Sequence, residues 1–232
     1  MSRGTRARAP RRAARSRPST IPPNGGFTFA ECPDLAAPEA RIIWRADIDP
    51  GTLDVIATPT IGHDPEGIDP ATLAPWLTIA RDSQGVEHAV LSDGWHHIRL
   101  DLAAGTLAGT APVVLGYHLR GIANTIAKIL PLRRLLALCR HRRFAASLFP
   151  ADRRIDRWLV LLRVHDALAD GATQRDIAQA LFGAERVARE WAGPSDSLRS
   201  RTRRLIRDAT VMAQGGYRSL LHTAALDRND ES

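Results

Sequence analysis

From residue 155 onward, apolar residues recur at the three- and four-residue spacing of a buried helix face. The first run, 155–169, is apolar on several sides, which predicts a helix that is buried on most of its surface and ends at Gly171. Thr173, with Asp176 three residues later, is typical of a helix N-terminus. It predicts a short second helix that ends at Gly183.

Two more helices are predicted after Gly183. Residues 184–191 can form a short helix, which the Gly–Pro pair at 193–194 ends. Ser195 then caps a longer helix over 196–214. The core predicted for this half of the chain contains Trp158, Leu162, Ile177, Leu181, Leu205, Ile206 and Ala209, with Tyr217 and Leu220 closing it.

The 196–214 helix has two different faces. At 100° per residue, one arc collects Leu198, Thr202, Leu205, Ile206, Ala209, Met212 and Ala213, the face that a helix buries. The opposite arc collects Arg199, Arg203, Arg204, Arg207, Thr210 and Gln214. Guanidinium groups on a helix can bond phosphates or the O6/N7 edge of guanine, so this pattern favours insertion into a DNA groove.

The layout resembles a helix-turn-helix, with two candidates for the helix that enters DNA. A standard helix-turn-helix joins its helices by about 3 to 4 residues, which by position favours the 184–191 helix. Charge favours the 196–214 helix, because Glu185 and Glu190 largely cancel Arg186 and Arg189. We choose the helix indicated by charge.

The first half of the chain has a pattern typical of short strands, unlike the helical pattern of the second half. Residues 41–48 and 50–62 predict extended runs, and 113–118 a further strand or the lead into a helix. The clearest signal is two alternating runs joined through Asp93 and Gly94, typical of a hairpin. Residues 27–119 therefore predict a small antiparallel sheet of three to five strands.

Between the two halves, residues 120–149 predict one or two helices, broken at Pro131. The fold class expected is α+β: a small antiparallel β-rich N-terminal domain followed by a helical, helix-turn-helix-like C-terminal domain. We expect a disordered basic tail over 1–26, the β-rich domain over 27–119, the helical domain over 120–222 with its helix-turn-helix-like core at 155–215, and a flexible end over 223–232.

Charge separates these parts. The chain of 232 residues has a net charge of +7, but residues 1–18 hold seven arginines and no acid, and residues 31–118 carry 13 acids against 4 basic residues. Residues 120–163 carry 11 basic residues against 2 acids, and residues 196–218 carry 6 against 2. Concentrated positive charge of this kind favours a polyanion as partner. The basic tail reads equally as an arm that follows phosphates and as a solubilising extension.

Four stretches together resemble a known family. They are LLRVHDALADGATQRDIAQALFG with the tryptophan that follows, SDSLRSRTRRLIRDA, the closing GGYRSLL and, near the front, PEARIIWRADIDPGTL. They resemble the DNA-binding domain of type VI secretion transcription factors, a proteobacterial family similar to excision activators of integrative and conjugative elements. The resemblance covers most of residues 27–222.

What the resemblance implies is a transcription regulator, an activator by analogy with those relatives, associated with mobile genetic elements. Its partners would be double-stranded DNA and, as further candidates, RNA polymerase or another regulator. Some relatives carry an extra N-terminal helical module with a W-E-F-L-R-R-N-like motif, which this sequence lacks. If activation depends on that module, this chain binds DNA without activating by itself or needs a partner.

The expected DNA contacts lie at the start and along the outer face of the 196–214 helix. Three arginines spaced four residues apart rise by about 6 Å per step and can follow a groove together. Serines at the helix start, beside its free N–H groups, can bind a phosphate. The residues are Ser195, Ser197, Arg199, Ser200, Arg203, Arg204 and Arg207. The alternative class is a protein-interaction adaptor that makes no DNA contact.

The sequence favours no enzyme class and no cofactor. His96 and His97 are adjacent, so on a strand they point to opposite faces and do not share a metal ion easily. No nucleophile elbow or phosphate loop occurs. Cys32 and Cys139 form no metal spacing or disulfide framework, which indicates a cytoplasmic protein. Glycines and Pro112 interrupt the uncharged run 102–119 too often for a membrane span.

Overall fold

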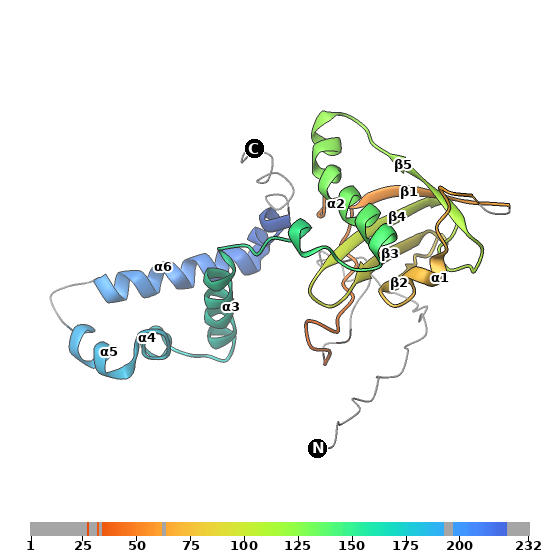
Figure 1. Ribbon diagram of the computed structural model, residues 1–232. Helices are drawn as coiled ribbons and strands as arrows, with labels where there is room; N and C mark the ends of the chain where they lie inside the picture. The colour runs from red at the N-terminus through yellow and green to blue at the C-terminus, as the bar shows by residue number, and fades with distance from the viewer. Residues whose placement is uncertain (1–26, 28–31, 33, 62–63, 193–196, 222–232) are drawn as a thin grey trace, which may run out of the picture. The chain divides into compact units, whose positions relative to one another are not determined.

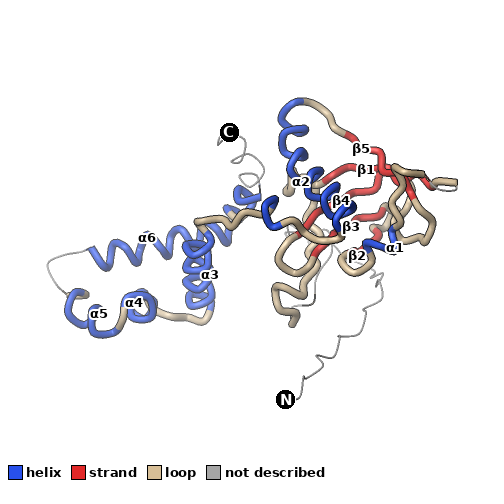
Figure 2. The backbone as a smooth tube through the Cα atoms, viewed as in Figure 1, coloured by secondary structure: helices blue, strands red, loops and turns tan. Residues whose placement is uncertain are grey.

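The computed structural model describes residues 27, 32, 34–61, 64–192 and 197–221. The chain divides into two compact units, each with its own core (Figures 1 and 2). The sheet unit contains the described residues up to Phe149 together with Leu221, and the helical unit runs from Pro150 to Leu220. An α+β fold was predicted, and it is confirmed.

The sheet unit is built on one five-stranded sheet with the order β2-β3-β4-β1-β5. All neighbours pair antiparallel except β1 and β4, which run parallel. The sheet is therefore mostly antiparallel, as the sequence predicted, and contains one parallel pair. The strands are β1 (Leu53–Pro59), β2 (Leu77–Arg81), β3 (Glu87–Ser92), β4 (His97–Ala104) and β5 (Val113–His118), with a short helix α1 (Pro70–Leu73) between β1 and β2.

The predicted hairpin is present as β3 and β4. They pair from Glu87 opposite Leu102 to Ser92 opposite His97, and Gly94 takes a positive φ of 104° in the turn. Gly94 was expected at this turn, because a left-handed backbone favours glycine. Alternate residues of β1 and β4 point into one core, where Val55, Leu100 and Ala89 are fully buried.

Helix α2 (Ile122–His141) covers one face of this sheet, against β1 and β4 (Figure 1). Leu135 and Leu138 are fully buried in the sheet core, so their helix belongs to the sheet unit although the sequence placed residues 120–149 in the helical domain. The predicted break at Pro131 is wrong, since α2 passes through it without interruption. Packing on both sides of the proline offsets the one backbone hydrogen bond that it removes.

The other face of the sheet is covered by residues 41–48, which were predicted as a strand. Apart from an isolated bridge between Trp44 and Phe27, the segment is irregular and ends in a turn at residues 46–48, so that prediction is wrong. Its carbonyl groups are used in other ways: Arg45 O accepts from the N–H of Ile48, and Trp44 O accepts from Arg99 Nε at 2.9 Å. Ile43 still serves the core, packing on Ala80 and Val90.

Three charged side chains buried in the sheet unit are paired with opposite charges, which offsets the cost of their burial. Arg99, 2% exposed, donates to Asp101 at 2.6 Å and to the carbonyl of Ala89 at 3.2 Å. Glu87, 3% exposed, accepts from Arg81, Thr106 and the N–H of Leu107. Lys128, the only lysine of the chain, pairs with Asp54.

The helical unit contains four α-helices in its described residues, at the places that the sequence predicted. They are α3 (Ile155–Ala169), α4 (Gln174–Phe182), α5 (Ala184–Glu190) and α6 (Ser197–Val211). A short 3-10 turn, η1 (Ala146–Leu148), lies before them in the chain, and a widened turn, η2 (Met212–Gly216), ends α6. Gly171 and Gly183, with φ of 83° and 89°, end α3 and α4 as expected.

The core of the helical unit lies between α3, α4 and α6. Leu161, Val164, Ile177 and Ala209 are buried, and Trp158, Leu181, Leu205 and Ile206 pack against them. Leu162 was predicted in this core and is instead 56% exposed, together with Ile155 and Leu159. The prediction of a helix buried on most sides was wrong because only one face of α3 meets α6; leucine identity alone does not tell which face that is.

Two adjacent leucines test this assignment. Leu161→Ala removes a side chain that is 6% exposed, whereas Leu162→Ala removes one that is 56% exposed. We expect Leu161→Ala to lower the free energy of unfolding by about 2 to 5 kcal/mol and Leu162→Ala by less than half as much. Urea unfolding of the full chain, followed by circular dichroism, measures both. Equal losses would mean that the orientation of α3 is wrong.

A second pair of substitutions tests the sheet. A Cβ added at Gly105, where φ is 79°, would lie 1.8 Å from the carbonyl oxygen of Ala57 in β1. Gly85, with φ of 82°, has no atom within 4 Å of the same position. Gly85→Ala should therefore cost only the left-handed strain of about 1 to 2 kcal/mol. Gly105→Ala should cost more than about 3 kcal/mol, beyond most single substitutions, in thermal or urea unfolding.

Candidate nucleic-acid interface

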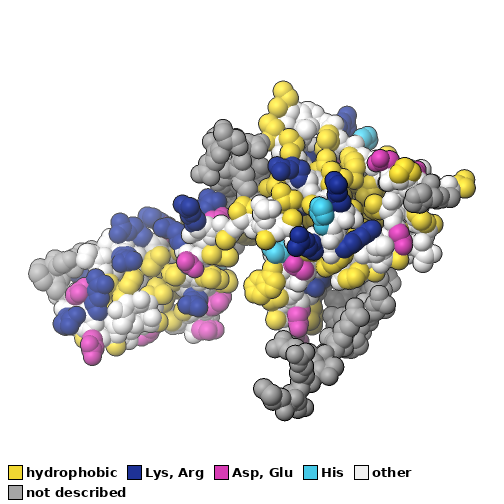
Figure 3. Space-filling view, viewed as in Figure 1, with side chains coloured by type: hydrophobic (Ala, Val, Ile, Leu, Met, Phe, Trp, Pro, Cys, Tyr) yellow, Lys and Arg dark blue, Asp and Glu magenta, His cyan; other side chains and the backbone are white. Residues whose placement is uncertain are grey.

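The candidate interface is the outer surface of α6. The helix carries five arginines and one carboxylate, Asp208. Its inner face is apolar and small, with Leu198, Thr202 and Ala209 at most 3% exposed. In the space-filling view, basic side chains line the helical unit along α6 (Figure 3).

The packing of the buried inner face of α6 fixes the direction of its exposed outer face. Thr202 is fully buried, and its hydroxyl is satisfied by the carbonyl of Leu198 one turn earlier, at 2.9 Å. Ala209 packs in the core formed with α3, and Leu198 packs in a second cluster with Ala178 of α4 and Val187 of α5. Because both ends of the buried stripe are held, α6 has little freedom to rotate about its axis, and the direction of its arginines is fixed.

The structure separates the predicted contact residues into two groups. Ser197, Arg203, Arg204 and Arg207 are exposed, as an interface requires, whereas Arg199 and Ser200 are half-buried. The backbone carbonyl of Arg199 accepts a hydrogen bond from Gln174 Nε2 of α4 at 3.2 Å. The side chain of Arg199 is therefore less accessible than the sequence indicated, since its Nε is buried. Ser195 lies outside the described residues.

One carboxylate shapes the charge of this surface. Asp208 pairs with Arg157 of α3 at 2.8 Å and lies 3.6 Å from Arg207. It therefore joins α3 to α6 and offsets part of the charge of two arginines. Arg204 forms no ion pair with the residues that the structure describes. Four of the five arginines of α6 precede Asp208 by more than one residue, so most of the basic charge of the helix lies in its first half.

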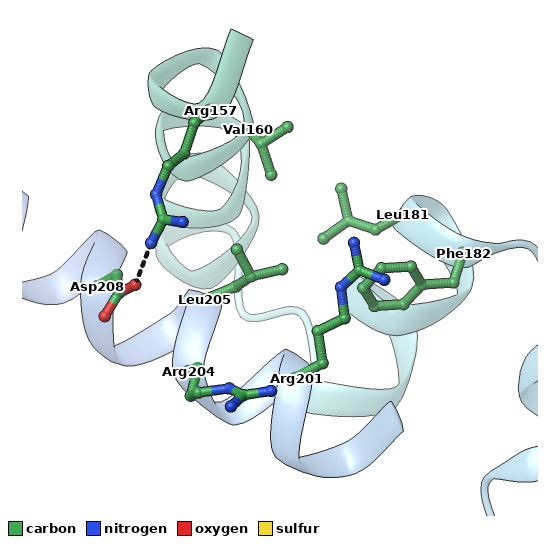
Figure 4. Close-up of a pocket in the computed structure, with 8 residues that line it drawn as sticks. All are labelled: Arg157, Val160, Leu181, Phe182, Arg201, Arg204, Leu205 and Asp208. Atoms are coloured by element: carbon green, nitrogen blue, oxygen red, sulfur yellow. Dashed lines mark hydrogen bonds and ion pairs between the residues drawn. The ribbon is translucent and has the colours of Figure 1, made fainter. Parts of the chain in front are cut away.

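A hollow of about 650 Å³ opens beside these arginines, between α3, α4 and α6 (Figure 4). Leu181, Leu205 and Val160 form its apolar wall, and the guanidinium of Arg201 lies over the ring of Phe182, 4.9 Å from its centre. Such a cation–π contact restricts the arginine without neutralising it. Arg201 and Arg204 thus present positive charge on the flank of α6 that borders the hollow.

Sequence reasoning missed Arg157 and Arg201. Arg157 lies on another helix, so only the fold brings it to Asp208. Arg201 falls at the border between the apolar and basic arcs of α6, and its spacing alone does not show whether it faces solvent or an aromatic ring. The one sign that Arg201 lies on the flank of α6 is that it directly precedes Thr202, which is buried.

Helix α4 supports α6 and is capped as predicted. Thr173 Oγ1 accepts from the N–H of Asp176 at 3.2 Å, and the Asp176 carboxylate accepts from the N–H of Thr173 at 2.9 Å. The hydrogen bonds from the Thr173 hydroxyl and N–H hold the pKa of Asp176 below its usual value. The cap fixes the start of α4, where the next residue, Gln174, bonds to α6.

Helix α5, the other candidate for groove insertion, has a weaker charge pattern. Its one buried residue, Val187, packs on α4 and on the start of α6. Arg186 is bonded to Glu190 one turn later at 3.1 Å, so the outer surface of α5 is close to neutral. The charges expected to cancel do lie in contact, at least for this pair.

The described residues hold no group of three or more histidine, cysteine or acidic side chains arranged for a metal ion. His96 instead packs on the rings of Phe144 and Phe149 and bonds to Asp93 at 2.9 Å. Among the helices described, none combines the length and apolarity that crossing a membrane requires.

The cap of α4 supplies a prediction. Thr173→Ala removes one half of the capping box and should lower the free energy of unfolding by about 1 kcal/mol. Thr210→Ala is the control, because Thr210 is exposed and bonds only to the Ile206 carbonyl of its own helix. Because the pKa of Asp176 is lowered in the folded state, its stabilising effect is present above the unfolded pKa and is lost as pH falls through the folded pKa. The stability difference between wild type and Thr173→Ala, from urea unfolding at several pH values, should therefore shrink in acid.

Comparison with known proteins finds a family that matches the C-terminal part of the chain. Residues 119–222 match a family model described as the DNA-binding domain of a T6SS transcription factor. The match begins just before α2 and covers all four helices of the helical unit. A search of curated proteins finds no match.

Proposed function

We propose that this protein, whose residues 119–222 match the model of the type VI secretion system transcription factor DNA-binding domain, regulates transcription by reading DNA with α6. That match supports DNA binding. The choice of α6 rests on one observation: the helix buries a narrow stripe and leaves Arg203, Arg204 and Arg207 exposed on its other side. The proposal assigns the chain no catalytic chemistry.

The packing of the helical unit supports the same choice. In a three-helix helix-turn-helix domain, the reading helix packs on the two helices before it and presents its outer face to the major groove. Here α6 packs on both α3 and α4, and α5 packs chiefly on α4. We therefore treat α3, α4 and α6 as the three-helix core, with α5 inserted in the connection between the second and third helices.

The exposed arc suggests a division of contacts. Arg203 and Arg207 lie one turn apart on the side away from the hollow and can reach base edges, where a bidentate guanidinium discriminates guanine. Arg204 and Arg201 lie on the flank that borders the hollow and suit backbone phosphates of one groove wall. Ser197, at the helix start, suits a phosphate as well.

We further propose that the protein activates transcription in the cytoplasm. Its resemblance to excision activators supports this role. A regulator that binds DNA and recruits RNA polymerase needs a second surface, which the sheet unit or the helical unit can supply. A reporter gene behind the cognate operator tests the direction of regulation. Rising expression with added protein supports activation, and falling expression identifies a repressor.

Substitutions in α6 test the reading helix. Arg203→Ala should weaken binding to cognate DNA by about 1 to 3 kcal/mol if its contact is to a base. The triple variant of Arg203, Arg204 and Arg207 to Gln should reduce the slope of log K against log salt by about 1, because only Arg204 of the three is assigned a phosphate contact and each such contact contributes about 0.9. Fluorescence anisotropy with genomic fragments, at several salt concentrations, measures both.

The matched control lies on α5. Arg186→Gln and Arg189→Gln change exposed arginines of the same unit without touching α6. They should leave affinity nearly unchanged, and none of the variants should shift the melting temperature by much. A larger loss in the α5 variants would transfer recognition to α5. Unchanged affinity in every variant would favour the adaptor that makes no DNA contact.

A further inference from the structure

The hollow between α3, α4 and α6 has one apolar side that the fold leaves partly open to water. Val160, Leu181 and Leu205, here called the apolar wall, line it from the three helices, and each is half-buried (Figure 4). The volume of the hollow, about 650 Å³, lies within the range of about 300 to 1,000 Å³ that is usual for small-molecule sites. The apolar body of a small molecule would therefore fit against this wall and remove it from water.

The charged side chains that line the hollow are mostly positive. Arg157 donates to Asp208 at 2.8 Å, so one guanidinium and the one carboxylate of the lining satisfy each other. Arg201 and Arg204 are exposed and form no ion pair with the residues that the structure describes. Three arginines against one aspartate leave the lining with a net charge of +2. An anionic ligand would therefore meet two guanidinium groups that no described carboxylate neutralises.

Arg201 is already held at the edge of the hollow. Its guanidinium lies 4.9 Å from the centre of the Phe182 ring, and both side chains line the hollow (Figure 4). The ring covers one face of the guanidinium plane, and the N–H groups at the edge of that plane can still donate to a carboxylate in a bidentate geometry. Because the ring restricts the arginine beforehand, less conformational entropy is lost when a ligand binds.

We propose that this hollow binds a small organic carboxylate with an apolar body, whose charged group pairs with Arg201 and Arg204 and whose body packs on the apolar wall. Inorganic phosphate or the DNA backbone would satisfy the arginines but leave the apolar wall uncovered. A neutral apolar molecule would cover the wall but leave the arginines unneutralised. A molecule with both parts matches both features of the lining.

Such a ligand would compete with DNA, a consequence that rests on the function proposed above. Arg201 and Arg204 are the residues assigned there to backbone phosphates, so a carboxylate that occupies them removes two phosphate contacts. Ligand and DNA would then each lower the affinity of the chain for the other by the same factor. The hollow would thus make DNA binding by this protein responsive to a small carboxylate.

Binding of a carboxylate is measurable without DNA. 1-Naphthoate combines two fused apolar rings with one carboxylate, and 1-naphthamide has the same rings without the charge. In equilibrium dialysis against the full chain, 1-naphthoate should bind about tenfold more tightly than 1-naphthamide, because a charge-assisted hydrogen bond to a guanidinium is stronger than a neutral one. Equal affinities, or no binding of 1-naphthoate, would overturn the proposal and leave the proposed function standing.

Variants of the lining locate the site. Arg201→Gln and Arg204→Gln should each weaken binding of 1-naphthoate about tenfold and leave that of 1-naphthamide nearly unchanged. The matched control is Arg189→Gln, which changes an exposed arginine of the same unit that does not line the hollow and should affect neither compound. An equal loss in Arg189→Gln and Arg204→Gln would overturn the proposal, because 1-naphthoate would then bind to the basic surface in general.

A bulky side chain tests whether the apolar body lies in the hollow. Val160→Trp fills the hollow without removing an arginine, so it should abolish binding of both naphthalene compounds. Undiminished binding of 1-naphthoate in a folded Val160→Trp variant would overturn the proposal. Circular dichroism and the melting temperature show whether this variant folds. The arginine variants lie at exposed positions and test the proposal independently of it.

Anisotropy titrations with DNA test the competition. Saturating 1-naphthoate should reduce the slope of log K against log salt by about 2, since each of the two phosphate contacts contributes about 0.9. Sodium acetate at the same concentration has the charge without the apolar body and should leave the slope unchanged. An unchanged slope with 1-naphthoate bound would overturn the competition. A chain that binds 1-naphthoate but no DNA would overturn the proposed function and support the site in the hollow, so the two failures are distinguishable.

Discussion

The small buried stripe of α6 is the constraint on which the helical unit depends. Thr202 and Ala209 are almost wholly inaccessible, and neither can be larger without moving α3 or α4. Because interiors are packed at high density, a helix held by such a stripe takes one rotation about its axis. That rotation decides which arginines face solvent. The direction of the basic surface is therefore a consequence of packing, and the charges themselves contribute little to it.

Ion pairs then change the distribution of charge on the surface of α6, whose direction packing has fixed. Asp208 joins α6 to Arg157 of α3, and its negative charge offsets part of the positive charge on the later turns of α6. Arg201 is held over Phe182 and keeps its charge. The unit therefore combines a strongly basic first half of α6 with a second half tied to its neighbour. An ion pair this exposed adds modestly to stability, so its main effect is on the distribution of charge.

Local chemistry determined much of this protein from sequence alone. The capping box at Thr173, the positive-φ glycines that end α3 and α4, and the hairpin of β3 and β4 depend on near neighbours, and all appear as predicted. The arginine face of α6 followed from helical periodicity. Tertiary structure decided what depends on distant partners: the parallel pairing of β1 with β4, the unbroken α2 at Pro131, and Arg157 beside Asp208. Leu161 and Leu162 show the physical reason, because identical side chains one position apart differ only in which of them another helix happens to cover.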